Sequence, residues 1–169
     1  TNIGVVKEIK VDGVALSSKE YKTEVVGEVT YYTNLVSSEE LANGNTYLFE
    51  YNDDNQLIEI WYKETPLSTA ELRFNYDYDA IGRLIYFEDV QNSKTYNYTY
   101  NSIGQISRIV DQDGNYREYM YDNYGQLSAY YYSINGNERL VNYEFSESLQ
   151  KYTSTTYFIS STNEIEKTF

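Results

Sequence analysis

Carboxylates, hydroxyls and amines are the side chains of this 169-residue chain that could do chemistry, because it contains no His and no Cys. This composition excludes the commonest general base, the commonest nitrogen ligand of metals and all thiolate catalysis. Asp77 and Asp79 would project from one face of a strand about 6.5 Å apart, near the carboxylate spacing of glycosidases. A solvated strand face explains Asp77 and a turn explains Asp79, so a carboxylate-based glycan hydrolase is the weakest functional alternative.

Two other patterns could do chemistry but have simpler explanations. Ser148 and Lys151 have the Ser-x-x-Lys spacing of some acyl enzymes, without the companion motifs. The segments 111–115 and 53–54 offer oxygen ligands that calcium accepts, but neither completes an EF-hand loop, and turns account for both. We therefore expect a protein that is not an enzyme, with no cofactor and no metal site.

A short motif recurs along the chain. The segment Tyr76–Leu84 has a core that returns at Tyr100–Ile106 and Tyr121–Leu127, and a looser copy lies at Tyr51–Leu57. Each copy has an aromatic residue, Asx, two free positions, Gly or Asn, a long polar residue, and Leu or Ile. The Asx side chain can accept a hydrogen bond from the N–H two residues on, and the Gly or Asn position suits a left-handed residue that closes a type I turn with a bulge. The structural turn residues are Asn52, Asn55, Asp79, Gly82, Asn101, Gly104, Asp122 and Gly125.

The segments between these turns have strand patterns. Leu72, Phe74 and Tyr76 alternate with polar residues, which predicts a strand with one largely aromatic face and one polar, solvent-exposed face. The strands that leave each turn carry bulky residues on both faces. Asp113-Gly114 and Asn135-Gly136 are two-residue hairpin signals. We therefore predict an all-β fold, an antiparallel meander of repeated β-hairpins with about 10–12 strands in one curled or partly barrel-like sheet.

No linker divides the chain, so we expect a single domain over residues 1–169, with non-repeat N-terminal strands at 1–46 and hairpin repeats at 47–169. Asp12-Gly13 predicts an early hairpin, and Val25–Tyr32 reads as a strand. Ser37–Gly44 has capping signals that predict one helical turn. A degenerate last copy is expected around Ile159 to Ile165.

Charge and hydropathy limit the partners. The chain has 26 acidic and 13 basic residues, a net charge of −13. Because no Lys/Arg cluster is present, we expect no nucleic-acid partner. No apolar run is long enough for a transmembrane segment. The start at Thr1 rather than Met favours an exported protein, in the periplasm, on the outer membrane surface or outside the cell, with a possible lipid anchor upstream of Thr1.

At Tyr76–Leu84 and Tyr119–Leu127 the sequence resembles the YD repeat of RHS and teneurin-type proteins, and the resemblance extends over Tyr47–Phe145. In large members of that family, many repeats spiral into a hollow β shell that encloses a toxin, or adopt a barrel shape. The copies here are too few to close a shell, so the resemblance implies the hairpin fold and not that function. In general style the chain is similar to small exported lipoproteins of Gram-negative envelopes, some with a porin-like β fold.

Aromatic residues on the strands that leave the turns are the best binding candidates. They are Trp61, Tyr62, Tyr86, Tyr130 and Tyr132, with Asn and Asp nearby. Such rings stack on sugars or anchor a protein partner, although the same rings would also fill the interior of a curled sheet. We predict a non-enzymatic cell-envelope or secreted module that presents a Tyr-rich sheet surface to a glycan or protein. The main alternative is a purely structural repeat segment of a surface or shell assembly.

Overall fold

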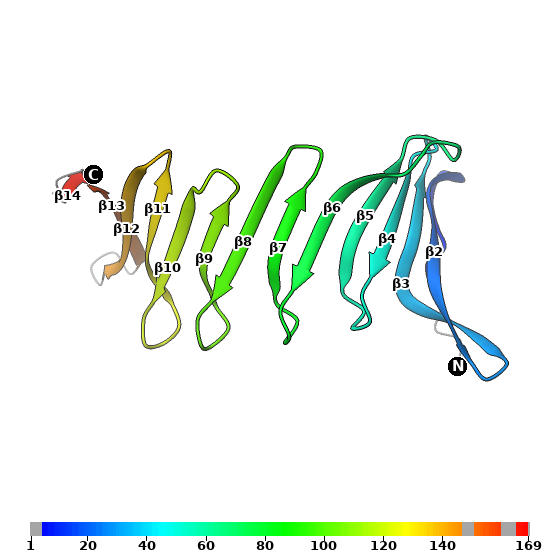
Figure 1. Ribbon diagram of the computed structural model, residues 1–169, viewed down its shortest axis with the longest axis horizontal. Coiled ribbons are helices and arrows are strands. Elements are labelled where there is room, and N and C mark those ends of the chain that lie inside the picture. The colour runs from blue at the N-terminus through cyan, green and yellow to red at the C-terminus, as the bar shows by residue number, and fades with distance from the viewer. Residues whose placement is uncertain (1–4, 147–150, 160–164, 169) are drawn as a thin grey trace. The chain divides into compact units, whose positions relative to one another are not determined.

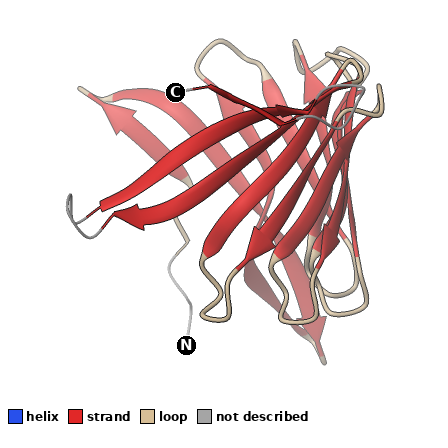
Figure 2. Ribbon diagram, turned by 90° about the vertical axis from the view of Figure 1, so that its left-hand side faces the viewer, coloured by secondary structure: helices blue, strands red, loops and turns tan. Residues whose placement is uncertain are grey.

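The computed structural model describes residues 5–146, 151–159 and 165–168, and every regular element within these ranges is a β-strand (Figure 2). The chain divides into two compact units, Thr1–Ser93 and Lys94–Phe169. In each unit, strands that follow one another in sequence pair antiparallel with each other (Figure 1). The predicted all-β antiparallel meander is therefore confirmed.

The first unit contains seven of the strands, of which β2 and β3 are the longest. They are β1 (Glu8–Val11), β2 (Val14–Val26), β3 (Val29–Leu41), β4 (Thr46–Tyr51), β5 (Leu57–Lys63), β6 (Glu71–Tyr78) and β7 (Leu84–Asp89). Asp12 and Gly13 form the β1–β2 turn with φ of 51° and 80°. The β1–β2 hairpin thus lies at the Asp-Gly pair that marks it in the sequence.

The second unit contains the remaining seven strands. They are β8 (Lys94–Tyr100), β9 (Ile106–Asp111), β10 (Tyr116–Tyr121), β11 (Leu127–Ile134), β12 (Asn137–Ser146), β13 (Lys151–Ile159) and β14 (Ile165–Thr168). The described residues therefore form fourteen strands, more than the ten to twelve expected. Of the proposed degenerate last copy, Ile159 and Ile165 lie in β13 and β14, whereas Asn163 lies outside the described residues.

The helical turn predicted at Ser37–Gly44 is wrong. Residues up to Leu41 belong to β3, and only Ala42 to Gly44 form a turn. Ser38 pairs with Glu20 of β2 and with Leu48 of β4, so strands flank this segment on both sides. Ladder hydrogen bonds to two neighbours outweigh the local capping preference of Ser and Asn-Gly, because secondary-structure propensity is a weak prior.

Few side chains in the described part of the chain are deeply buried. Ala129 and Val141 are 7% and 6% exposed, and Ser17 and Ser133 are the buried polar residues. The aromatic residues instead form half-buried pairs along the sheet. Phe74 and Phe87 stack with ring centroids 5.9 Å apart, and Tyr76 lies 5.3 Å from Phe87. Cross-strand ring pairs of this kind each contribute roughly 0.2–1 kcal/mol, so the sheet is held by many small contacts between neighbouring strands.

Candidate functional site

The adjacent residues Trp61 and Tyr62 of β5 point to opposite faces of the first unit, because side chains alternate along a strand. The Trp61 indole Nε1 donates a 2.8 Å hydrogen bond to Glu59. The Tyr62 ring lies 5.4 Å from the Tyr47 ring, and the Arg73 guanidinium lies 4.5 Å from its centroid. Tyr62 is therefore packed among its neighbours, whereas Trp61 belongs to a more polar face.

Tyr86 of β7 is half-buried and carries a carboxylate partner. Its hydroxyl donates to Glu88 Oε2 at 3.2 Å. Burial is the largest cause that raises the pKa of Tyr86, and the hydrogen bond and charge of Glu88 add to it. Since the phenol stays neutral at physiological pH, Tyr86 acts as a hydrogen-bond donor on this face.

Tyr130 and Tyr132 belong to a ring cluster in the second unit. Their ring centroids are 5.8 Å apart, and the Tyr130 ring lies 6.0 Å from Tyr119 and 6.2 Å from Tyr143. The Arg139 guanidinium lies 5.9 Å from the Tyr132 ring. Burial, followed by the neighbouring Tyr143 and Tyr132 hydroxyls, raises the pKa of Tyr130. This cluster offers a ring surface that is partly open and partly used for packing.

The five predicted binding residues do not all share one face, because the adjacent side chains of Trp61 and Tyr62 point to opposite sides of β5. Three of them lie on the two faces of the first unit, and Tyr130 and Tyr132 lie in the second unit. Each one contacts another described side chain. The rings thus contribute to the packing of neighbouring strands and can contribute to binding only through their exposed edges.

The recurring turn residues share one geometry. In each copy the Asx side-chain Oδ1 accepts hydrogen bonds from the N–H groups two and four residues on; the Asx residues are Asn52, Asp79, Asn101 and Asp122. The left-handed position has φ of 62° at Asn55 and of 87°, 88° and 77° at Gly82, Gly104 and Gly125. A register shift precedes each turn, next to the motif's aromatic residue. Every shared polar residue therefore has a partner within its own turn or strand.

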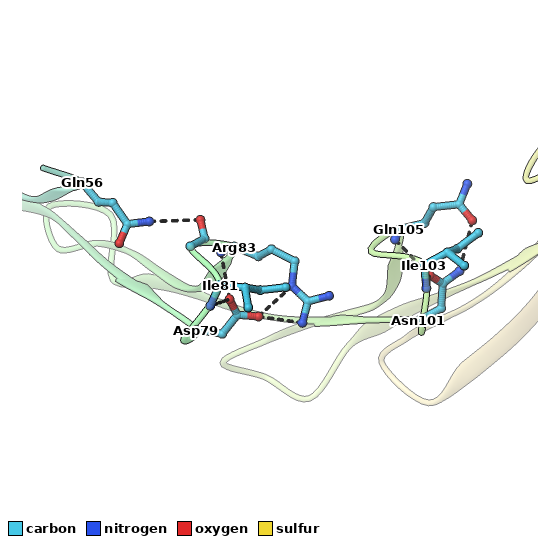
Figure 3. Close-up of polar contacts among 8 residues, drawn as sticks. Gln56, Asp79, Ile81, Arg83, Asn101, Ile103 and Gln105 are labelled. Carbon is cyan, nitrogen blue, oxygen red and sulfur yellow. Dashed lines mark hydrogen bonds and ion pairs between the residues drawn. The ribbon is translucent and has the colours of Figure 1, made fainter. Parts of the chain in front are cut away.

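The long polar residue of the motif does more than its sequence pattern indicates. Gln56 Nε2 donates to the carbonyl of Gly82 at 3.0 Å (Figure 3). In the second unit, Gln105 Nε2 donates to the carbonyl of Gly125 at 2.7 Å. Each bond joins the turn of one copy to the turn of the next. In the sequence, the recurrence of a long polar side chain just after Gly or Asn could have indicated a shared role. It does not identify the backbone carbonyl of the next copy as the hydrogen-bond acceptor.

The aromatic residue of the motif makes a bond in the reverse direction. The Tyr78 hydroxyl donates to the Leu57 carbonyl at 2.8 Å, and the Tyr121 hydroxyl donates to the Ile106 carbonyl at 2.7 Å. We refer to the paired forward and backward bonds as the turn ladder. The Tyr51 hydroxyl makes a bond of the same kind, 2.9 Å to the Val36 carbonyl, so the ladder extends to the non-repeat strand β3.

The second copy has an ion pair inside its turn. Arg83 Nη2 and Nε each lie 2.7 Å from Asp79 Oδ2 (Figure 3). In the first and third copies Asn52 and Asn101 donate instead to Gln56 and Gln105. The backbone N–H of Arg83 is the largest cause that lowers the pKa of Asp79; burial opposes it, and the Arg83 side chain adds to the lowering. Asp79 is therefore a turn residue whose carboxylate is held in its ionised form.

The proposed calcium ligands at 111–115 form a turn of the same design at the other end of the strands. Asp111 Oδ1 accepts from the N–H groups of Asp113 and Asn115, and Asp111 Oδ2 accepts from Asn115 Nδ2. Burial alone would raise the pKa of Asp111, but these hydrogen bonds and nearby Lys94 hold it below its ordinary value. Asn115 Oδ1 in turn accepts from Asn135 N–H at 2.7 Å, which links this turn to the next one.

Asp77 is the other chemical candidate that the structure places. Asp77 Oδ1 accepts from the Tyr78 N–H, which places this carboxylate against its own strand. Ser148 lies outside the described residues. Within the ranges that the structure describes, no three His, Cys, Asp or Glu side chains gather in a group that could hold a metal ion. Those ranges also contain no helix of the length and hydropathy needed to cross a membrane.

No protein-family model and no curated protein sequence matches the chain. Solved structures do match. The crystal structure of TcdB2-TccC3-Cdc42 is 13% identical with a TM-score of 0.54, over 90% of this chain and 10% of the matched chain. Its fold is similar to this meander. The crystal structure of TcdB2-TccC3 without the hypervariable C-terminal region is 12% identical with a TM-score of 0.53, over 90% and 10%.

This chain thus spans about a tenth of the length of those matched chains. At such low identity, the likeness to the TcdB2-TccC3 structures shows the fold alone. It agrees with the YD-repeat resemblance of the sequence, because both rest on an antiparallel meander of hairpins.

Proposed function

We propose that this chain is a non-enzymatic structural module whose hairpin repeats build a β wall in a surface or shell assembly. The turn ladder is the observation that carries this proposal. Gln105 and Tyr121 tie two successive copies together in opposite directions, and Gln56 and Tyr78 do the same in the first unit. The recurring side chains are therefore committed to joining repeats.

The shallow burial supports the same proposal. Ala129 and Val141 are the apolar residues with less than a tenth of their surface exposed in the described part of the chain. In repeat proteins each unit contacts only its neighbours, and stability is nearly a sum of unit and neighbour terms. A wall of this kind lengthens by adding hairpins and needs no enlarged core.

Removal of one complete repeat tests the proposal. Deletion of 101–121 joins Tyr100 to Asp122 and preserves both strand direction and turn chemistry. We expect cooperative urea unfolding to persist, with a lower midpoint and a smaller m-value because less surface is exposed on unfolding. Deletion of 101–111 is the matched control, since it reverses the direction of all later strands and should abolish folding of the second unit. If the two deletions are equally damaging, the repeats are not exchangeable wall units.

A binding role for the ring cluster of the second unit is the second candidate. The observation that favours it is the group of half-exposed Tyr130, Tyr132 and Tyr143 rings with Arg139 beside them. Half-exposed tyrosines with a nearby Arg are typical anchors for a protein partner and also stack on sugars. Binding on a glycan array that is lost in Tyr130→Ala/Tyr132→Ala would support this role. Binding that survives the double change would exclude this surface.

The exported location and the lipid anchor stay predictions. Fractionation of the source cells with an antibody against this chain tests both. Recovery in a detergent-released membrane fraction would support the anchor, and recovery in the periplasm or medium would support export alone. Recovery in the cytoplasm would contradict the exported location.

A further inference from the structure

A hollow of about 260 Å³ opens on one face of strands β2 to β5 in the first unit. Two rows of cross-strand neighbours line it. Ser18, Glu40, Thr46 and Lys63 form the first row, each paired with the next. The second row runs in register beside it as Glu20, Ser38 and Leu48, and Trp61 is the next residue in that row.

Side-chain size explains why the sheet is hollowed here. Among the residues that line the hollow, short and long side chains alternate along each row, and the two rows are out of phase. Ser38 therefore lies between the longer Glu20 and Leu48, and Thr46 lies between Glu40 and Lys63. Short side chains form the floor and long ones form the walls. Pro66, in the loop after β5, adds a further wall, and its carbonyl accepts a 3.3 Å hydrogen bond from Lys63 Nζ.

The polar groups around the hollow are available to a ligand. Among the described residues, no protein partner hydrogen-bonds to the side-chain oxygens of Ser18, Glu20, Ser38, Glu40 and Thr46, and no ion pair engages either carboxylate. Hydroxyls can donate and accept, carboxylates accept, and the Lys63 ammonium donates. Leu48 and Pro66 supply apolar surface in the same lining.

We propose that this hollow binds one uncharged pyranose ring. A sugar presents hydroxyls around its rim and C–H groups on its faces, which match the mixed hydroxyl, carboxylate, ammonium and apolar lining. The volume is just below the roughly 300–1,000 Å³ of pockets for drug-sized ligands, which suits a single ring. The two carboxylates and the net charge of −13 disfavour an anionic ligand.

The position of Trp61 beside the hollow allows binding of a free sugar to be distinguished from binding of the end of a glycan. Trp61 follows Leu48 in the second row, and its indole is held by Glu59 at 2.8 Å. A ring in the hollow that carries a second sugar toward β5 would bring that sugar to the indole, where stacking adds affinity. This site does not depend on the wall function, because Ser18, Glu20, Ser38 and Glu40 of its lining lie on the non-repeat strands β2 and β3.

Saturation-transfer NMR on the whole chain tests the site, with glucose, galactose, mannose and N-acetylglucosamine as probes, each as a free sugar and as a disaccharide. We expect saturation transfer to at least one free sugar, and tighter binding of a matching disaccharide if the natural source is a glycan. Equal affinity for both forms would identify the free sugar as the source. The absence of transfer to every probe at millimolar concentration would overturn the proposal.

Two sets of variants locate the binding. Ser38→Tyr fills the floor and should abolish binding, while Thr30→Tyr, on the same strand outside the hollow, should leave it unchanged. Glu20→Gln/Glu40→Gln keeps the shape but loses charge-assisted acceptors, so affinity should fall about tenfold. A far-ultraviolet circular dichroism spectrum and melting curve for each variant establish that it is folded. Sugar binding that persists in folded Ser38→Tyr would place the ligand elsewhere and overturn the assignment.

Discussion

Gln105 donates its side-chain amide to the backbone carbonyl of Gly125, 2.7 Å away and one repeat further along the chain. Tyr121 of that next repeat donates its hydroxyl back to Ile106, the residue after Gln105. Two residues of the motif thus bond two adjacent copies in opposite directions. The same exchange joins Gln56 to Gly82 and Tyr78 to Leu57 in the first unit.

Replacement of the ladder amide should weaken the second unit. Gln105→Glu keeps the side-chain size but directs a carboxylate oxygen at the Gly125 carbonyl, so a donor becomes an acceptor. We expect a loss of about 1–2 kcal/mol in the free energy of unfolding, measured by urea denaturation. Asn123→Ala, at an exposed turn position, is the control and should change stability by less than about 0.5 kcal/mol. Equal effects of the two substitutions would contradict the ladder.

The backward bond can be removed without a change in packing. Tyr121→Phe and Tyr78→Phe each delete one hydroxyl and keep the ring. Because a neutral hydrogen bond contributes about 0.5–1.5 kcal/mol, we expect a loss of about 1 kcal/mol from each. Tyr124→Phe is the control, since Tyr124 is 89% exposed. Melting curves unaltered by all three changes would show that the hydroxyl bonds add nothing.

The left-handed turn position should reject β-branched residues. Gly125 has φ of 77°, and a Cβ built there would lie 3.4 Å from Gln105 Nε2. Gly125→Val should therefore cost roughly 1–3 kcal/mol, from backbone strain and from disturbance of the ladder amide. Gly125→Asn should cost less, because Asn55 adopts φ of 62° at the equivalent position. Thermal denaturation of both variants measures the difference, and a Val variant as stable as the parent would argue against the turn geometry.

Acid should selectively weaken the second turn. The pKa of Asp79 is lowered from its ordinary 3.8, chiefly by the Arg83 N–H and also by its guanidinium. A carboxyl group with a lowered folded-state pKa stabilises the protein above its ordinary pKa, and that stabilisation is lost as the pH falls through the folded-state value. The stability difference between the parent and Asp79→Asn should thus be largest near neutral pH and shrink as the pH is lowered below the ordinary 3.8.

Urea midpoints of the parent and of Asp79→Asn, each measured at neutral pH and at acidic pH, give this difference in stability. The double change Asp79→Asn/Arg83→Gln copies the Asn101–Gln105 turn and is the control, because it should restore stability near neutral pH without acid sensitivity at this turn. A parent–variant difference that is constant with pH would show that the carboxylate charge is not what stabilises the turn.

The sequence by itself determined the local part of this protein. Alternating Tyr and polar residues predict strands, and the Asx and Gly spacing predicts the turns, because both follow from backbone geometry within a few residues. The all-β meander could therefore be predicted. Ser37–Gly44 could not be assigned in this way, since its capping signals are local while its strand state depends on the pairing of Ser38 with β2 and β4.

Only the tertiary structure decided how the copies are joined and where the candidate site lies. From the sequence alone, Gln105 is one more polar turn residue. Only the structure shows that its side-chain amide donates to the carbonyl of Gly125. The hollow depends on the register that brings Glu20, Ser38 and Leu48 into one row across three strands. Such contacts join residues far apart in sequence, and a shift of one residue in register would send each side chain to the other face of the sheet.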